Sequence, residues 1–296
     1  MNWNSFCTEQ YPLDLPGTLA GGQAFRWRRD SRGTWWGVIG AGVAALREQP
    51  DAAPRQILWQ TFPERDDWPA LSRYLRLDED LHALYASWRS DEHLGPASGR
   101  HAGLRILRQP PLECLFAFQC AAANTVVKIE RTVARLAERY GERIVTELTD
   151  EPWPFYAFPT PAALAEADEG DLRADLWGYR APRVIAAAHS LLQRDAGWLD
   201  ALQSAPWGEA RTDLMQFFGI GRKIADCIAL FGLGCDEAVP VDTHILRISI
   251  ELLGYRSAAK SLTPTAYQEI GDLWRRRYGN RAGWAQQYLF LDALQR

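Results

Sequence analysis

The sequence predicts an α+β protein, in which a twisted antiparallel β-sheet domain precedes a larger, all-helical region. Before residue 100, short β-type segments alternate with turns that contain Gly and Pro. After residue 104, nearly every segment has helical periodicity. The chain has 296 residues, which is the length of about two ordinary domains. We therefore expect a sheet domain in residues 1–100 and a helical region in residues 101–296.

The β-type segments of the first part are expected to form strands at residues 23–29, 34–39, 41–48 and 55–62. Two short helices should follow near residues 67–75 and 78–90, the second opened by an aspartate at its N-cap. The Gly-Pro-Ala-Ser-Gly stretch at residues 95–99 is typical of a linker, so we place the domain boundary there.

The helical part should begin at Pro111, with a helix that continues, after a break near Asn124, to Tyr140. Pro161 and Pro182 each have a position typical of a first helical turn. Further helices are expected at residues 209–218, 222–231, 243–253, 264–277 and 281–294.

The charged residues nearly balance, with 33 basic against 37 acidic side chains and a net charge of −4. A polyanionic partner would therefore have to bind to a local basic face. Only three of the basic residues are lysines, namely Lys128, Lys223 and Lys260. Because guanidinium groups stay protonated, an amine nucleophile has to come from these lysines or from the N-terminus.

The five cysteines are scattered and form no Cys-x-x-Cys pair, so we expect no disulfide framework, no zinc or iron–sulfur site, and no cofactor. The first 14 residues lack the apolar segment of a signal peptide. The most apolar stretch, residues 112–127, is interrupted by polar side chains and is too short to cross a bilayer. We expect a cytoplasmic, reducing setting without membrane association.

One stretch carries candidate chemistry: Phe-Gly-Ile-Gly-Arg-Lys-Ile-Ala-Asp-Cys at 218–227, followed by Val-Pro-Val-Asp-Thr-His at 239–244. Gly219 and Gly221 stand between two helical segments and predict a tight hairpin near residues 209–231. Such a turn exposes backbone N–H groups at a helix N-terminus, where they can bind an anion. An ordinary turn between helices is the alternative.

Three polar residues near this hairpin each have a chemical and a structural interpretation. Lys223 stands at the start of a helix, whose positive end should lower the pKa of the amine and help to free a nucleophile; the alternative is a solvated surface charge. Asp242 precedes a helical run, as an N-cap carboxylate does, and capping is compatible with chemistry. His244 can be an ordinary polar residue of a first turn.

Together with other segments in the same order, these residues resemble the helix-hairpin-helix DNA glycosylases, and among them the 8-oxoguanine DNA glycosylase/AP lyases. The hairpin with its lysine and the following Pro-Val-Asp are typical of the lyase-competent branch. Gly-Gln-x-Phe-Arg-Trp and Ala-Gly-Trp-Ala-Gln are typical of the 8-oxoguanine type. The similar segments are residues 13–15, 22–27, 113–116, 178–181 and 282–286.

The resemblance implies an enzyme that flips 8-oxoguanine out of duplex DNA and excises it, with AP lyase activity by β-elimination. It implies that Lys223 attacks the sugar C1′ and forms a Schiff base, and that Asp242 stabilises positive charge on the sugar. Gly219 and Gly221, through their amides, and His244 should contact DNA phosphates. The implied partner is double-stranded DNA with an oxidised purine. We expect a monomer, associated with the nucleoid in a bacterium or nuclear in a eukaryote.

The resemblance also implies a lesion pocket. Gly22 matches the position whose carbonyl accepts the N7–H that 8-oxoguanine has and guanine lacks. Cys227 and Phe290 match the pair that sandwiches the base, and Gln286 matches the residue that reads its Watson–Crick edge. Without the resemblance, Phe290 would be interpreted as a core aromatic and Cys227 as a small buried hydrophobe.

The residues facing the opposite strand depart from the family pattern. Tyr179 and Arg180 match residues that wedge the duplex and contact the orphaned cytosine. The family's gap-filling asparagine falls at Ala123, although Asn124 follows directly. The family's arginine falls at Lys128, which lacks a planar fork of donors. We therefore expect a weaker preference for cytosine opposite the lesion than the family shows.

Two other function classes remain open on the sequence alone. Superfamily relatives for oxidised pyrimidines usually carry a four-cysteine iron–sulfur loop, which this sequence lacks, and relatives for alkylated bases typically lack the lysine. A non-catalytic helix-hairpin-helix module would need only the hairpin, so the presence of both Lys223 and Asp242 favours an enzyme.

Overall fold

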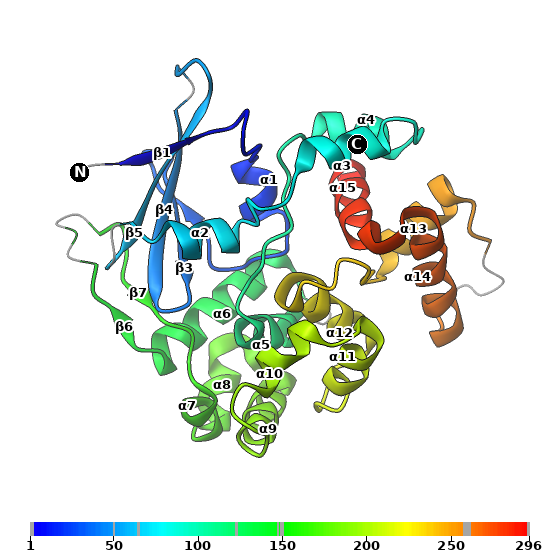
Figure 1. Ribbon diagram of the computed structural model, residues 1–296. Helices are drawn as coiled ribbons and strands as arrows, with labels where there is room; N and C mark the ends of the chain where they lie inside the picture. The colour runs from blue at the N-terminus through cyan, green and yellow to red at the C-terminus, as the bar shows by residue number, and fades with distance from the viewer. Residues whose placement is uncertain are drawn as a thin grey trace.

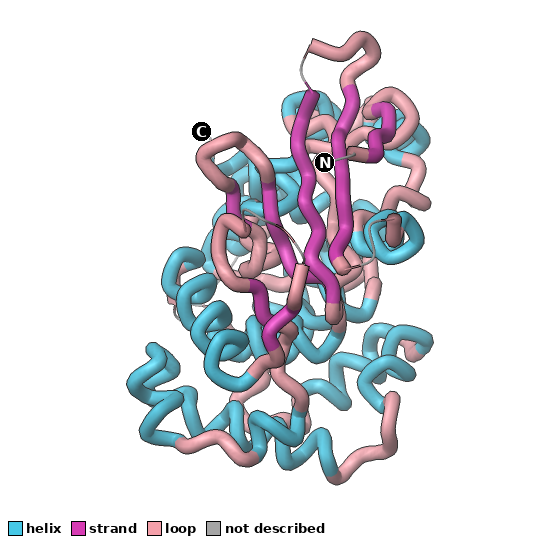
Figure 2. The backbone as a smooth tube through the Cα atoms, turned by 90° about the vertical axis from the view of Figure 1, so that its left-hand side faces the viewer, coloured by secondary structure: helices cyan, strands magenta, loops and turns pink. Residues whose placement is uncertain are grey.

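A five-stranded antiparallel sheet and a larger group of helices make up the computed structural model. Figure 1 shows the sheet at one side of the helices, and Figure 2 shows its strands side by side. The residues that the structure describes are 3–49, 51–63, 66–121, 124–146, 148, 151–256 and 262–294. The predicted α+β class, with sheet first and helices after, is confirmed.

The sheet has the strand order β1-β5-β4-β3-β2. Its strands are β1 (Asn4–Cys7), β2 (Arg28–Arg29), β3 (Trp35–Ile39), β4 (Gly42–Gln49) and β5 (Gln56–Phe62). The predictions for β3, β4 and β5 are confirmed within a residue or so. Residues 23–29 form a strand only at Arg28–Arg29, and β1 was not predicted.

Both faces of the sheet are buried, because successive strand residues point to opposite sides. Trp35 packs with Leu46 and Trp59 in a cluster that includes the first two helices, α1 (Leu15–Ala20) and α2 (Trp68–Tyr74). Its neighbour Trp36 packs in a separate cluster on the other face. That second cluster includes residues of a two-stranded ribbon made of β6 (Arg143–Ile144) and β7 (Phe155–Tyr156). We had expected the region after residue 100 to be wholly helical, and the ribbon of β6 and β7 shows that this prediction is wrong.

Helices build the rest of the molecule. They are α3 (Leu81–Trp88), α4 (Leu94–Arg100), α5 (Pro111–Ala121), α6 (Val126–Tyr140), α7 (Pro161–Ala165), α8 (Glu169–Leu172), η1 (Arg173–Trp177), η2 (Gly178–Arg180), α9 (Ala181–Leu192), α10 (Trp198–Ala201), η3 (Leu202–Ser204), α11 (Trp207–Leu214), α12 (Arg222–Ile228), η4 (Ala229–Leu233), α13 (Thr243–Leu253), α14 (Pro264–Tyr278), η5 (Gly279–Arg281) and α15 (Ala282–Leu294). The helices predicted from Pro111 onward are confirmed, except that the helix expected at residues 209–218 ends at Leu214, and α12 continues into the π-helical turn η4. No described helix is long and apolar enough to cross a membrane.

The linker expected at residues 95–99 is wrong, because that stretch lies inside helix α4. Asp91 accepts hydrogen bonds from the first amides of this helix, including that of Leu94 at 2.8 Å, and so starts it. Pro96 lies in the first turn, where a missing N–H costs nothing. Leu94 and Ala97 are fully buried in the same cluster as the helices after residue 104. Burial of this face therefore outweighs the low helix propensity of its glycines.

The last helix returns to this early segment. Figure 1 shows α15 beside α3 and α4. Arg100 donates to Asp292 at 2.6 Å, and the Tyr85 and Tyr288 hydroxyls lie 2.9 Å apart. The C-terminal helix, which carries two of the predicted lesion-binding residues, is thus fixed against the first hundred residues.

Candidate active site

The predicted hairpin is present between α11 and α12, whose ends meet in the turn at residues 215–221. The Ile220 N–H donates to the Phe217 carbonyl at 3.0 Å and closes the turn. Gly219 has φ +82°, a left-handed conformation that favours glycine, and a Cβ there would lie 2.5 Å from Cδ of the flexible Arg183 side chain. Gly221 has extended backbone and open space around it. Whether these amides bind phosphate stays a prediction.

Lys223 and Cys227 lie one turn apart on α12, so their side chains share a face of the helix. The Lys223 ammonium is hydrogen-bonded to the Cys227 sulfur. Cys227 is buried, and burial raises the pKa of its thiol. The candidate nucleophile is therefore held against a sulfur atom and is not a solvated surface charge.

The expected lowering of the Lys223 pKa by the helix N-terminus is wrong. The pKa of the amine is raised, because its interactions with the Cys227 sulfur and, more weakly, with the Asp242 carboxylate stabilise the ammonium more than burial destabilises it. In the free protein the lysine is therefore held as the ammonium form. A proton has to leave before the amine can attack.

Asp242 is the N-cap of α13, as its position in the sequence predicts. Its Oδ1 accepts hydrogen bonds from the backbone N–H groups of His244 and Ile245, each at 2.9 Å. Oδ2 takes part in neither cap bond, and the carboxylate charge acts on Lys223. Capping thus fixes the carboxylate beside the amine without using both of its oxygens.

A buried contact joins the helix of the lysine to the segment of the aspartate. Asp226 on α12 is 1% exposed and accepts from the Tyr267 hydroxyl at 2.5 Å and from the Trp207 indole at 2.8 Å. The Tyr267 oxygen in turn accepts from the backbone N–H of Val241 at 3.4 Å. Val241 immediately precedes Asp242. Desolvation raises the pKa of the Asp226 carboxyl, and the two hydrogen bonds oppose that shift.

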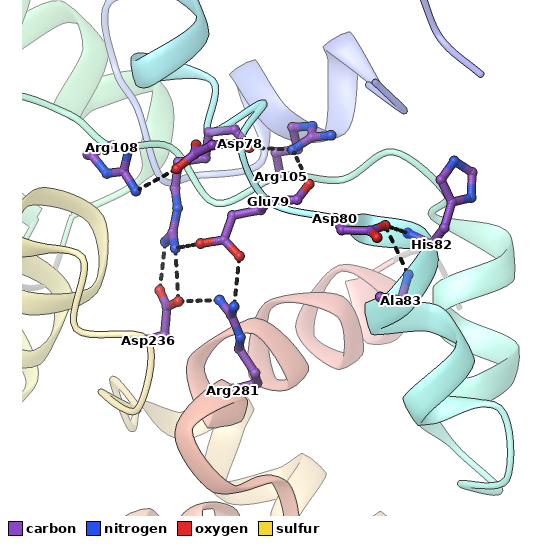
Figure 3. Close-up of polar contacts among 10 residues, drawn as sticks. Asp78, Glu79, Asp80, His82, Ala83, Arg105, Arg108, Asp236 and Arg281 are labelled. Atoms are coloured by element: carbon purple, nitrogen blue, oxygen red, sulfur yellow. Dashed lines mark hydrogen bonds and ion pairs between the residues drawn. The ribbon is translucent and has the colours of Figure 1, made fainter. Parts of the chain in front are cut away.

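An ion-pair network holds the loop that ends at Asp242. Arg76 donates to both oxygens of Asp236, at 2.6 and 2.9 Å, and Arg281 donates to the same carboxylate at 2.5 Å. Glu79 accepts from both arginines. Figure 3 shows Glu79, Asp236 and Arg281 pointing toward one another. The network links the turn between α2 and α3 to the loop at residues 234–242 and to the start of α15.

Helix α15 packs directly on this loop. The Gly283 N–H donates to the Asp236 carbonyl at 2.7 Å, and a Cβ at Gly283 would lie 2.6 Å from the Ala238 carbonyl oxygen. The close approach therefore requires glycine. It brings Gln286 and Phe290, which lie one turn apart on α15, to the side of the loop that carries the aspartate.

One of the predicted lesion-binding residues, Phe290, contacts the site, and a second, Gln286, carries an unpaired buried oxygen. The rings of Phe290 and His244 meet edge to face, with centroids 5.9 Å apart. Gln286 is 5% exposed, and its side-chain oxygen is buried without a hydrogen-bond partner among the described residues. An unpaired buried amide oxygen is costly unless a ligand donates to it.

Gly22 approaches the same helix through its neighbour, because Gln287 on α15 donates to the Gly21 carbonyl at 3.3 Å. Gly22 itself has φ +82°, a left-handed conformation that favours glycine. The structure brings Lys223, Cys227 and Asp242 together. It places Gly22 only by way of this neighbouring contact.

The residues expected to face the opposite strand differ in exposure. Lys128 is exposed on the first turn of α6, whereas Asn124 turns back and donates to the Cys120 carbonyl at 3.3 Å. Tyr179 is 56% exposed, while Arg180 is 5% exposed with its guanidinium 4.3 Å from the centre of the Tyr179 ring. Ala123 and Lys260 lie outside the described residues.

Sequence reasoning missed Asp226 and Tyr267. Asp226 lies inside the hairpin motif, and a carboxylate among the buried residues of α12 is a signal that could have been used. Tyr267 comes 41 residues later, and nothing in its local pattern indicates the contact.

Comparison with known proteins shows to which family this chain belongs. The model of the 8-oxoguanine DNA glycosylase N-terminal domain matches residues 5–115, and that of the HhH-GPD superfamily of base excision DNA repair proteins matches residues 119–275. The chain belongs to the HhH-GPD superfamily. The resemblance inferred from the sequence is confirmed.

Relatives within the superfamily are similar over nearly the whole chain. The N-glycosylase/DNA lyase OGG1 of Arabidopsis thaliana is 32% identical over 95% of this chain and 78% of its own. The N-glycosylase/DNA lyase of Saccharomyces cerevisiae is 30% identical over 94% and 82%. A crystal structure of Clostridium acetobutylicum 8-oxoguanine glycosylase/lyase with dsDNA containing cytosine opposite 8-oxoG has a TM-score of 0.82 and 27% identity, and covers 96% of this chain and 92% of that one.

Proposed function

We propose that this protein is a bifunctional base-excision repair enzyme, which removes 8-oxoguanine from duplex DNA and then cleaves the strand as an AP lyase. The observation that carries the proposal is the placement of a half-buried lysine amine beside Cys227 and the Asp242 carboxylate, directly after a helix-hairpin-helix turn. The names of the relatives, and the DNA complex of the clostridial enzyme, support the same substrate class.

In the proposed reaction Asp242 stabilises positive charge that develops on the deoxyribose as the glycosidic bond breaks. The bonding electron pair leaves with the base, and the Lys223 nitrogen forms a bond to C1′. The ammonium of Lys223, on which the Asp242 charge acts, gives up one proton before the attack, and the departing base takes up that proton and leaves neutral. Opening of the sugar ring breaks the C1′–O4′ bond, places a proton on O4′ and yields the protonated Schiff base. Removal of a C2′ proton then forms the C2′–C3′ double bond and expels the 3′ phosphate, which is the β-elimination.

For lesion recognition we propose that Cys227 and Phe290 enclose the flipped base, that Gln286 contacts its Watson–Crick edge, and that the Gly22 carbonyl accepts from N7–H. The unpartnered buried oxygen of Gln286 supports this assignment, because a base N–H would satisfy it. We further propose that the enzyme acts as a monomer, since a single chain supplies every one of these residues.

The function is tested by single-turnover base release from matched duplexes that differ only in the target base. The set contains 8-oxoguanine, guanine, thymine glycol and 3-methyladenine. We expect rapid release of 8-oxoguanine with strand cleavage, and no release of guanine. Faster release of the oxidised pyrimidine or of the alkylated purine would assign the site to another branch. DNA binding without any release would favour a non-catalytic module.

The buried contact of Tyr267 makes a separate prediction. Tyr267→Phe removes the hydroxyl that joins Asp226 to Val241. The helix that carries Lys223 and the segment that carries Asp242 then lose the hydrogen bonds that connect them through this hydroxyl. Because small misplacements of reacting groups can cost up to about 100-fold in rate, we expect base release to slow by roughly 10- to 100-fold. The affinity for DNA should not change.

Tyr255→Phe is the matched control for this prediction, because its hydroxyl binds an exposed glutamate, Glu269. That variant should release the base at the wild-type rate. If Tyr267→Phe does so as well, the contact has no positioning role.

The enzyme should discriminate only weakly among the four bases that can stand opposite the lesion. Lys128 is an exposed point charge, and Asn124 is turned toward Cys120, so neither presents a rigid fork to a base edge. One good bidentate contact is worth about 1–3 kcal/mol, or very roughly 5- to 150-fold. We expect a modest preference for cytosine that Lys128→Arg increases. Single-turnover excision opposite C, T, G and A measures both, and discrimination of several hundredfold in the wild type would contradict the prediction.

A further inference from the structure

An arginine lies between two exposed aromatic rings next to the hairpin. The Arg183 guanidinium carbon is 5.2 Å from the centre of the Tyr179 ring and 5.8 Å from that of the Phe218 ring. Phe218, in the hairpin turn, is 61% exposed, although phenylalanine is a large apolar side chain. We call Tyr179, Arg183 and Phe218 the stacked cluster.

Buried residues of α5 and α9 hold the stacked cluster in place. Gln119, which is buried on α5, donates to the Phe218 carbonyl at 3.1 Å and fixes the hairpin turn. Gly219 allows the Arg183 side chain to cross the turn, since a Cβ would lie 2.5 Å from its Cδ. Arg183 itself projects from the first turn of α9, whose Val184 is fully buried. The two rings and the backbone of the stacked cluster are therefore fixed in position before any ligand binds.

The charge of Arg183 is not neutralised within the part of the chain that the structure describes. No carboxylate there lies within 4.0 Å of it, whereas Arg76, Arg139 and Arg281 each pair with one or more acids. Stacking on rings leaves the in-plane N–H donors of a guanidinium available, and their fork fits the oxygens of a phosphate. A half-buried, unneutralised and oriented guanidinium is suited to bind an oxyanion.

We propose that the stacked cluster is a further DNA contact, in which Arg183 binds a backbone phosphate and the exposed Phe218 ring packs against the adjoining sugar. The inference rests on the proposed function only in taking duplex DNA as the partner. Continuity supports that partner, because Phe218 belongs to the hairpin turn beside Gly219 and Tyr179 is expected to wedge the duplex, so Arg183 lies between two predicted DNA contacts. Contacts to phosphate and sugar position a protein without reading sequence. The cluster therefore contributes affinity to damaged and undamaged duplexes alike.

The test measures the dissociation constant against salt concentration for two duplexes, one undamaged and one with a tetrahydrofuran abasic analogue. Loss of one phosphate contact lowers the slope of log K against log salt by about 0.9. We expect Arg183→Gln to lower the slope by this amount on both duplexes. Arg183→Lys should keep the slope, because it keeps the charge. Phe218→Ser should weaken binding by about fivefold or more at an unchanged slope.

Arg194→Gln is the matched control. Arg194 also stacks on two rings, those of Trp198 and Phe217, each at 4.6 Å, but it lies just beyond the other end of α9, about 16 Å away along the helix axis. We expect the wild-type slope for this variant. An unchanged slope for a folded Arg183→Gln, or a protein that binds neither duplex, would overturn the proposal.

The outcome is separable from the proposed function, because binding to the undamaged duplex is measured without any excision. A slope that falls as expected, in a protein that releases no 8-oxoguanine, keeps the DNA contact and rejects the enzyme assignment.

Discussion

Lys223→Gln is expected to abolish strand cleavage and borohydride cross-linking while DNA binding is largely retained. An amide nitrogen cannot attack C1′ or form a Schiff base, so every covalent step is lost. The hairpin turn and the stacked cluster do not depend on the amine, so phosphate contacts should remain. Cross-linking on an abasic duplex and the dissociation constant of the same duplex are the two measurements.

Lys128→Gln serves as the control for this substitution, because Lys128 is an exposed lysine on α6 that has no place in the proposed chemistry. Its cross-linking should persist, because Lys223 is intact, although loss of the Lys128 charge weakens contact with the opposite strand. Cross-linking that survives in Lys223→Gln would assign the nucleophile to another amine, and the proposed mechanism would be wrong.

Asp242→Asn should slow base release by about 100-fold or more and leave the fold intact. Asparagine caps a helix about as well as aspartate, so the bonds from the amides of His244 and Ile245 can persist and the free energy of unfolding should change by less than about 1 kcal/mol. The negative charge beside the sugar is lost, however, and preorganised charge of this kind is worth two or more orders of magnitude in rate. Single-turnover base release and thermal unfolding measure the two effects.

Asp80→Asn provides the matched control, since Asp80 caps α3 in the same way, with bonds from His82 and Ala83 at 2.9 and 3.0 Å. That variant should excise normally. If Asp242→Asn also excises at close to the wild-type rate, the carboxylate is an N-cap and nothing more.

The sequence allowed most of the helical part to be predicted, because its signals are local. Periodicity and capping residues define α13, α14 and α15 within a residue or two. Helix α4 could not be predicted in this way. Its glycines and proline indicate a linker, and only burial of Leu94 and Ala97 against later helices makes it helical. Strand β1, of four residues, likewise depends on pairing with β5, some fifty residues away.

In the candidate site, too, the features that could be predicted are local in the sequence, and those that could not depend on tertiary contacts. Lys223 and Asp242 lie in short motifs that can be recognised directly. The direction of the shift in the lysine pKa could not be predicted, because it depends on the Cys227 sulfur and the Asp242 carboxylate, which folding brings to the amine. The contact of Asp226 with Tyr267, like the place of Arg183 between two rings, joins segments that no sequence pattern relates.

The most direct test of the proposed function is borohydride trapping of the wild-type protein on a duplex with a single 8-oxoguanine opposite cytosine, followed by mass mapping of the cross-linked peptide. We predict one adduct, on Lys223, which forms with the lesion duplex and not with the same duplex containing guanine. An adduct on another amine, or release of the base without any trapped adduct, would contradict the assignment of Lys223 as the nucleophile of a glycosylase that is also a lyase.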